Sequence, residues 1–166
     1  MVVLKIGGKP MKTKELLMKA VETAMQTMEQ NIGGPFGAAL VDGEGKVYLA
    51  SNSVLGGHDP TAHAEINVIR KACQDKQTHD LTGCVVYTTC YPCPMCLSAC
   101  IWANIKEVYY GCTPKDAAAI GFRDDFIYSF INGGCTDASV LPIHAAEREI
   151  CLPLFEAYAK MDKEIY

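Results

Sequence analysis

Two short motifs contain the side chains best suited to chemistry. His63 lies in the sequence HAE, and Cys93 and Cys96 follow about thirty residues later in PCPMC. Two thiolates and one imidazole supply three of the four ligands of a tetrahedral zinc ion and leave the fourth position open to water. Because a structural zinc site needs a fourth protein ligand, this donor set predicts a catalytic zinc ion held by His63, Cys93 and Cys96.

Glu65 lies two residues after His63 and is the predicted proton carrier. Zinc lowers the pKa of a bound water from about 15.7 to about 7, which makes a nucleophile available near neutral pH. Glu65 would take a proton from that water, deliver it to a ring nitrogen and later protonate a leaving amine. H-x-E combined with P-C-x-x-C is the signature of zinc-dependent deaminases, so we expect hydrolytic release of ammonia from an aminated ring.

The cysteine spacing also permits an interpretation from a different class. Cys90, Cys93, Cys96 and Cys100 match the C-x2-C-x2-C-x3-C run of bacterial iron–sulfur proteins. The proline that normally follows the last cysteine is Ile101 here, and no second run occurs. An iron–sulfur or structural metal-binding protein that uses the 90–100 run is therefore an alternative, and a colourless preparation with about one zinc per chain would exclude it.

The apolar pattern places both motifs at helix N-termini. A helix predicted over 62–72 begins with His63 and Glu65 in its first turn, and a strand over 84–89 leads to a helix that starts at Pro94. The positive end of a helix dipole favours thiolates, which agrees with the position of Cys93 and Cys96.

The remaining elements alternate between helix and strand, as is typical of an α/β domain. We predict helices over 13–30, 114–120 and 150–161, a hairpin of strands over 36–41 and 46–50, and further strands over 107–110 and 140–145.

Composition limits the class of protein. A chain of 166 residues that is 49% hydrophobic suits a single domain spanning residues 1–166. The formal net charge of −4, without a long basic run, disfavours nucleic acid as a partner. No apolar stretch suits a secretory signal or a membrane span, and the odd cysteine count disfavours a disulfide framework, so we expect a cytoplasmic protein that does not bind a membrane.

Longer blocks of the sequence resemble the cytidine-deaminase superfamily and, within it, the small bacterial guanine deaminases. The blocks DPTAHAE (59–65) and PCPMC (92–96) are shared with tRNA adenosine deaminases. The pattern GF-x-D-x-FIY (121–128) and the terminal Tyr166 are more particular to guanine deaminases. GGPFGA (33–38) and IRKAC (69–73) extend the resemblance over nearly the whole chain.

This resemblance implies a three-layer α/β/α sandwich around a five-stranded mixed sheet, and a homodimer that exchanges its C-terminal segments, about 146–166. It implies hydrolysis of guanine to xanthine and ammonia. Asn52 and the backbone of Ala64 would hold the base, Phe36 would pack on its ring, Asp124 would accept a hydrogen bond from its edge, and Tyr166 would come from the neighbouring subunit. Structural roles are the alternatives: Asn52 in a loop, Phe36 in the core, Asp124 as a helix cap and Tyr166 as a frayed end.

Two residues depart from the family pattern. Tyr91 occupies a position that is commonly Glu in guanine and tRNA deaminases, and Arg123 replaces the first Asp of the GFDD stretch. These departures keep other aminated heterocycles open as substrates, such as guanosine, an aminotriazine or a modified purine. tRNA adenosine is a further alternative, although the acidic charge balance argues against binding a polyanion.

Overall fold

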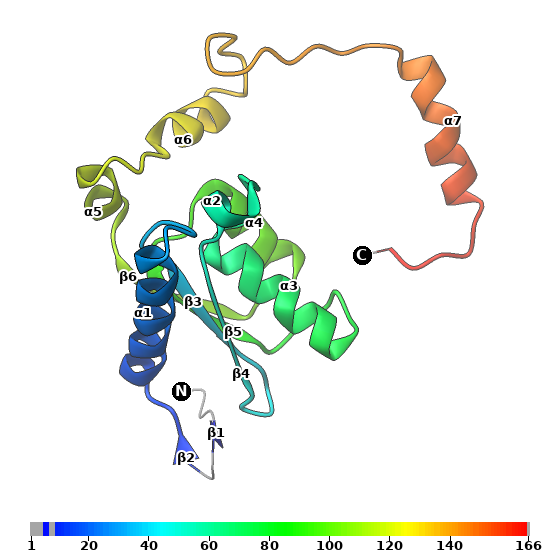
Figure 1. The fold of residues 1–166 in the computed structure, drawn as a ribbon. Helices are drawn as coiled ribbons and strands as arrows, with labels where there is room; N and C mark the ends of the chain where they lie inside the picture. The colour runs from blue at the N-terminus through cyan, green and yellow to red at the C-terminus, as the bar shows by residue number, and fades with distance from the viewer. Residues whose placement is uncertain (1–4, 7–8, 166) are drawn as a thin grey trace. The chain divides into compact units, whose positions relative to one another are not determined.

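The chain divides into two compact units in the computed structural model, which describes residues 5–6 and 9–165. The first unit ends at Asp124 and the second begins at Asp125 (Figure 1). The first unit contains, in order, β1 (Lys5–Ile6), β2 (Lys9–Pro10), α1 (Thr13–Glu29), β3 (Gly37–Val41), β4 (Val47–Ser51), α2 (Val54–Gly57), α3 (Ala64–Lys76), β5 (Val85–Cys90), α4 (Pro94–Trp102), β6 (Glu107–Cys112) and α5 (Pro114–Ala119). Both motifs therefore lie in the first unit.

The main sheet is mixed and has the strand order β4-β3-β5-β6. β3 is antiparallel to both of its neighbours, whereas β5 and β6 are parallel. In this register Thr88 of β5 pairs with Ala38 of β3 on one side and with Tyr110 of β6 on the other. β5 is thus an interior strand, which agrees with its nearly continuous burial.

Helices cover both faces of this sheet. On one face Leu40 and Val86 pack with Val68 of α3. On the other face Val41 and Val85 pack with Leu16 of α1. Neighbouring strand residues point to opposite faces, so β3 and β5 contribute to both cores. Figure 1 shows α1 and α3 on opposite sides of the strands, which confirms three α/β/α layers within the first unit.

The prediction of five strands in this sheet is wrong, since four strands pair within it in the described part of the chain. The expected fifth strand, 140–145, has no regular structure and lies in the second unit. Leu141 and Ile143 are exposed, and Pro142 has no backbone N–H to donate to a neighbouring strand. The pairing of β1 with β2, the helix α2 and the helix over Asp125–Asn132 were not predicted from the sequence pattern.

The second unit consists of two helices, α6 (Asp125–Asn132) and α7 (Arg148–Ala159), joined by a segment without regular structure. Several large apolar side chains on α7 are exposed, among them Ile150 and Leu154, each 73% exposed. No helix in residues 5–6 and 9–165 is both long enough and apolar enough to cross a membrane.

Candidate metal and catalytic site

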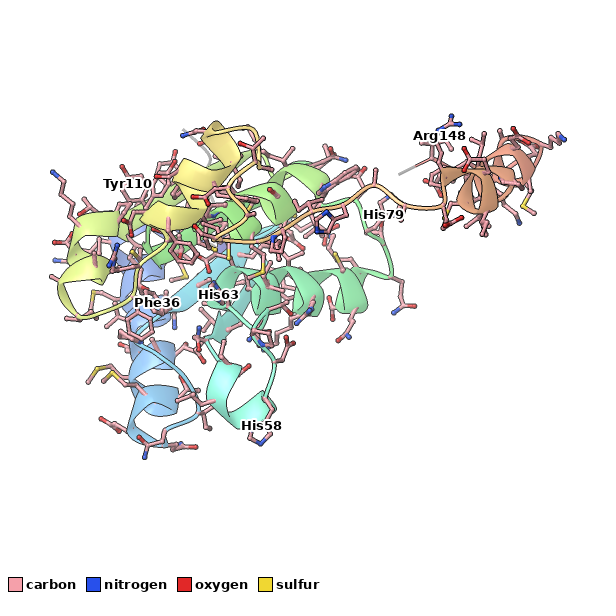
Figure 2. All side chains as sticks on the ribbon, turned by 90° about the horizontal axis from the view of Figure 1, so that it is seen from above. Phe36, His58, His63, His79, Tyr110 and Arg148 are labelled. Atoms are coloured by element: carbon pink, nitrogen blue, oxygen red, sulfur yellow. The ribbon has the colours of Figure 1, made fainter. Side chains whose placement is uncertain are left out.

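The two motifs meet because two helices begin at the same place. His63 is the extended residue that precedes α3, and Cys93 occupies the equivalent position before α4, where Pro94 supplies the first helical residue. Proline suits this position because its missing N–H would have no partner within the helix. His63 is labelled in Figure 2. The local sequence therefore explains why the donor atoms lie at helix N-termini, as predicted.

The donor atoms have the spacing of a zinc site. His63 Nδ1 lies 3.6 Å from Cys93 Sγ and 3.6 Å from Cys96 Sγ, and all three atoms lie within 4.8 Å of one another. In a tetrahedral site with Zn–S of about 2.3 Å and Zn–N of about 2.0 Å, nitrogen and sulfur ligands are about 3.5 Å apart. The three residues fit zinc, and they form the one group of this kind found in residues 5–6 and 9–165.

A hydrogen bond between the two thiols shifts their pKa values in opposite directions. A hydrogen bond from Cys96 lowers the pKa of Cys93 to about 4, and a hydrogen bond with His63 acts in the same direction. The hydrogen bond that the Cys96 thiol donates to Cys93 raises the pKa of Cys96. Burial and the charge of Glu65 raise it further. Of the two thiols, Cys93 therefore loses its proton first and carries the negative charge. A divalent cation favours the deprotonated form of each ligand, so metal binding would release the proton from Cys96.

Glu65 is nearly buried next to this group, with 6% of its surface exposed. Its Oε2 accepts from Cys96 Sγ at 3.5 Å, and its Oε1 accepts from Thr88 Oγ1 at 2.9 Å. Burial raises the pKa of Glu65, although the hydrogen bonds from Thr88 and Cys96 oppose this shift. A buried carboxyl group with a raised pKa beside metal ligands has the properties of a general acid–base.

Negative charge also surrounds His63. The hydrogen bond with Cys93 is the largest of the effects that raise the pKa of His63, and the charges of Glu65 and Asp124 add to it. The structure therefore places the Asp124 carboxylate close enough to His63 to interact electrostatically, at the end of the first unit.

Asn52, expected to hold a base, is 5% exposed and immediately follows β4. Its Oδ1 accepts from the backbone N–H groups of Gly34 and Val54, each at 3.2 Å. A Cβ atom on Gly33 would lie 2.0 Å from the Asn52 carbonyl oxygen, so only glycine lets the two segments approach this closely. These contacts fix the Asn52 side chain by its oxygen.

The other expected base contacts lie in the same unit. Phe36 immediately precedes β3 and meets Phe122 edge-to-face, with ring centroids 4.9 Å apart. Ala64 is buried at the first position of α3. Tyr166 lies outside the described residues. The first unit thus contains Asn52, Ala64, Phe36 and Asp124, together with the metal ligands.

An apolar cavity of about 380 Å³ also borders Phe36. Its walls come from α1, the ends of β5 and β6, and α5, so it lies on the α1 side of the sheet. None of the three metal ligands lines this cavity, nor does Glu65. The cavity and the metal group are therefore separate features.

Two cysteines of the 90–100 run do not join the metal group. Cys90 Sγ donates to the Thr113 carbonyl at 3.6 Å, and burial raises the pKa of Cys90 to about 11. Burial likewise raises the pKa of Cys100 to about 12. Neither cysteine belongs to the group of possible metal ligands found in residues 5–6 and 9–165, so the described residues do not bring together the four thiolates that an iron–sulfur cluster needs.

Two polar residues near the site, Thr88 and Asn67, were not predicted from the sequence. Thr88 is 1% exposed and contacts Glu65. Asn67 Nδ2 donates to the Ser51 carbonyl at 2.9 Å and to Ser53 Oγ at 3.0 Å, so it ties α3 to the segment that contains Asn52. A hydroxyl side chain within the β-strand sequence CVVYTT was the available signal for Thr88.

Comparisons with known proteins agree with this geometry. Residues 11–112 match the family model described as the cytidine and deoxycytidylate deaminase zinc-binding region. The guanine deaminase of Bacillus subtilis (strain 168) is 44% identical over 122 residues, which cover 74% of this chain and 78% of that protein. An X-ray structure of guanine deaminase from Bacillus subtilis superposes with a TM-score of 0.86 at 39% identity and covers 94% of this chain and 99% of that one.

A second group of similar proteins is named for a different activity. The tRNA-specific adenosine deaminase of Aquifex aeolicus (strain VF5) is 37% identical over 103 residues, which cover 61% of this chain and 68% of that protein. The similarity to this relative covers less of the chain than the similarity to the guanine deaminase.

Proposed function

The chain belongs to the cytidine and deoxycytidylate deaminase family, and we propose that it is a zinc-dependent hydrolase that converts guanine and water to xanthine and ammonia. The observation that carries this proposal is the group of His63 Nδ1 and two cysteine sulfurs with the buried Glu65 carboxylate beside it. The similarity to a guanine deaminase over most of both chains supports guanine as the substrate.

His63, Cys93 and Cys96 would hold the zinc ion through Nδ1 and the two Sγ atoms. When bound, zinc acidifies a coordinated water so that a nucleophile is available near neutral pH. Glu65 Oε2 lies on the side of the metal ligands, where it can accept the proton that this water loses. Glu65 would deliver this proton to a ring nitrogen, then take the second proton of the water from the hydroxyl group added to the ring carbon and pass it to the departing amine, which leaves as ammonia.

Four groups would orient the base. Asn52 Oδ1 is held by two backbone N–H groups, which fixes the direction of its amide N–H groups, and these would donate to the ring. The backbone of Ala64 lies next to His63 and would contact the base there. The Phe36 ring would pack on the base, and Asp124 would accept a hydrogen bond from its edge.

A substrate panel tests the proposed function. Ammonia release is measured with guanine, guanosine, adenine, cytosine, an aminotriazine and tRNA, together with zinc content. We expect rapid release from guanine and about one zinc per chain. If guanine is inert and another amine reacts, zinc-dependent deamination stands and the assignment of guanine as the substrate fails. The differences from the family pattern at Tyr91 and Arg123 would then explain the change of substrate.

We also propose that all 166 residues act as one deaminase domain within a homodimer that exchanges the C-terminal segments, about 146–166. Support comes from the second unit, which is separately compact. On α7, Ile150, Leu154 and Tyr158 recur at four-residue steps and are exposed, as on a helix that packs against another surface. Nine free cysteines suit a reducing compartment, so we place the enzyme in the cytoplasm.

Complementation tests the exchange. A Glu65→Gln chain and a chain that ends at Ile165 are each expected to be nearly inactive, because one lacks the proton carrier and the other lacks Tyr166. Mixed dimers should recover activity, because the Glu65→Gln chain supplies Tyr166 to the intact Glu65 site of its partner. Mixed dimers without recovered activity would show that Tyr166 does not serve the site of the neighbouring subunit.

A further inference from the structure

Thr88 makes a buried contact to the predicted proton carrier. Thr88 Oγ1 donates to Glu65 Oε1 at 2.9 Å, and the two residues are 1% and 6% exposed. A hydrogen bond to a charged group in such surroundings is stronger than one between neutral groups, and removing the donor leaves a buried oxygen without that partner. The hydrogen bond from Thr88 therefore affects the orientation of the Glu65 carboxylate as well as the packing around it.

The sheet holds Thr88 rigidly. β5 lies between β3 and β6, and Thr88 is paired in register with Ala38 and Tyr110. Thr88 lies two residues after Val86, which packs with α3, so its side chain points to the same face. A β-branched side chain is also restricted at χ1. The hydroxyl is therefore directed toward the start of α3 by the interior of the sheet.

The two oxygens of Glu65 have different partners as a result. Oε1 accepts from Thr88, whereas Oε2 lies 3.5 Å from Cys96 Sγ, on the side of the metal ligands. The terminal torsion of a glutamate is broad and roughly two-fold, so an unrestrained carboxylate could rotate and exchange its oxygens. The Thr88 hydroxyl restrains this rotation.

We propose that Thr88 is a positioning residue for the deamination reaction: it holds Glu65 Oε1 so that Oε2 is the oxygen that moves the proton. This inference rests on the proposed function, because it assigns a role within that same site. Thr88 itself would not touch the substrate or the metal. Partners that orient the groups around a metal site typically contribute 10- to 100-fold to activity or metal affinity.

Two substitutions at Thr88 separate the hydroxyl group from the packing. Thr88→Val keeps the branched shape and loses the hydroxyl, whereas Thr88→Ser keeps the hydroxyl and loses a methyl group. We expect Thr88→Val to lower kcat by about 10- to 100-fold, to leave KM for guanine nearly unchanged and to keep about one zinc per chain. Thr88→Ser should recover most of the lost kcat, and both variants should bind xanthine with nearly the affinity of the unmodified enzyme.

Infrared spectroscopy supplies a readout that does not depend on turnover. The band of the Glu65 carboxylate is identified as the one that Glu65→Gln removes, and Thr88→Val should shift it while Thr88→Ser should not. An unshifted band, an unchanged kcat in Thr88→Val, or a Thr88→Ser variant as slow as Thr88→Val would overturn the positioning role. If the unmodified protein does not deaminate guanine, the proposed function fails, and the infrared band then decides separately whether Thr88 restrains Glu65.

Discussion

At the scale of single residues, the site offers one set of side chains suited to metal binding and a separate carboxyl group suited to proton transfer. His63, Cys93 and Cys96 offer one nitrogen and two sulfurs with the spacing that zinc requires. Glu65 lies beside them but its oxygens contact Thr88 and the Cys96 thiol. The carboxylate is therefore placed to exchange protons next to the metal rather than to complete the ligand set.

Replacing Glu65 by Gln tests this separation. The substitution keeps the size of the side chain and removes the basic oxygen, so we expect kcat to fall by about 10²- to 10⁴-fold. Zinc content should remain about one per chain, because no ligand is lost. Steady-state kinetics and metal analysis measure both quantities, and near-normal turnover would remove Glu65 from the mechanism.

Cys96→Ala tests the opposite change, in which a predicted metal ligand is removed and the proposed proton carrier is kept. It deletes a sulfur ligand and leaves Glu65 in place, so we expect loss of bound zinc and of activity together. Ser98→Ala serves as the control, because Ser98 is exposed on α4 and its hydroxyl donates to the Pro94 carbonyl of the same helix. Activity that survives in Cys96→Ala would contradict the assigned ligand set.

At the scale of elements, β5 and α3 together position the site. β5 carries Thr88 and leads into the loop before Cys93, while α3 begins directly after His63. α1 supports β5 from the opposite face and packs very closely on β3: a Cβ atom on Gly37 would lie 2.0 Å from the Ala20 carbonyl oxygen. The position of the sheet therefore depends on the absence of a side chain at Gly37.

Gly37→Ala should destabilise the fold by about 1–3 kcal/mol, because the added methyl group forces the α1 backbone away from β3. Gly43→Ala is a matched control, since a Cβ atom there would meet nothing within 4 Å. Urea unfolding of both variants measures the free energies of unfolding. Equal stability of the two variants would show that α1 adjusts to the methyl group without cost.

Asn67 links α3 to the segment that follows β4, so Asn67→Asp should disturb both stability and substrate binding. The new carboxylate would face the Ser51 carbonyl in place of a donor, and we expect a loss of about 1–3 kcal/mol together with a higher KM. Gln26→Glu makes the same chemical change at an exposed position of α1 and should have little effect. Urea unfolding and kinetics distinguish the two variants.

At the scale of the whole molecule, the metal group joins segments that are far apart in the sequence. His63 comes from the start of α3 and the cysteines come from the start of α4, after β5 has crossed the sheet. A ligand that binds only the folded state stabilises it in proportion to the logarithm of its concentration. Zinc should therefore contribute to the stability of the first unit as well as to its chemistry.

Removal of zinc with a chelator should lower Tm, and restoring free zinc to about 1,000 times its Kd should return roughly 4 kcal/mol of stability. Cys93→Ala should show a lower Tm that does not respond to added zinc. Differential scanning calorimetry with and without zinc makes the comparison. A Tm that is independent of zinc in the unmodified protein would contradict a metal site in the folded chain.

The sequence pattern predicted the three donor residues that the structure brings together, the carboxyl group of Glu65 beside them, and the positions of most of the surrounding helices and strands. These features are local: two motifs contain all four residues, and a proline at the first helical position together with apolar spacing marks each helix start. Family resemblance added the three layers, which the structure confirms within the first unit.

The remaining features depend on pairing between segments that are distant in the sequence, so they could be read only from the folded chain. The register of β5 turns Thr88 toward Glu65, and the path of the chain separates Cys90 and Cys100 from the metal ligands. The fifth strand expected over 140–145 fails for the same reason, because a strand exists only where another segment accepts its backbone hydrogen bonds, and no local pattern specifies that neighbour.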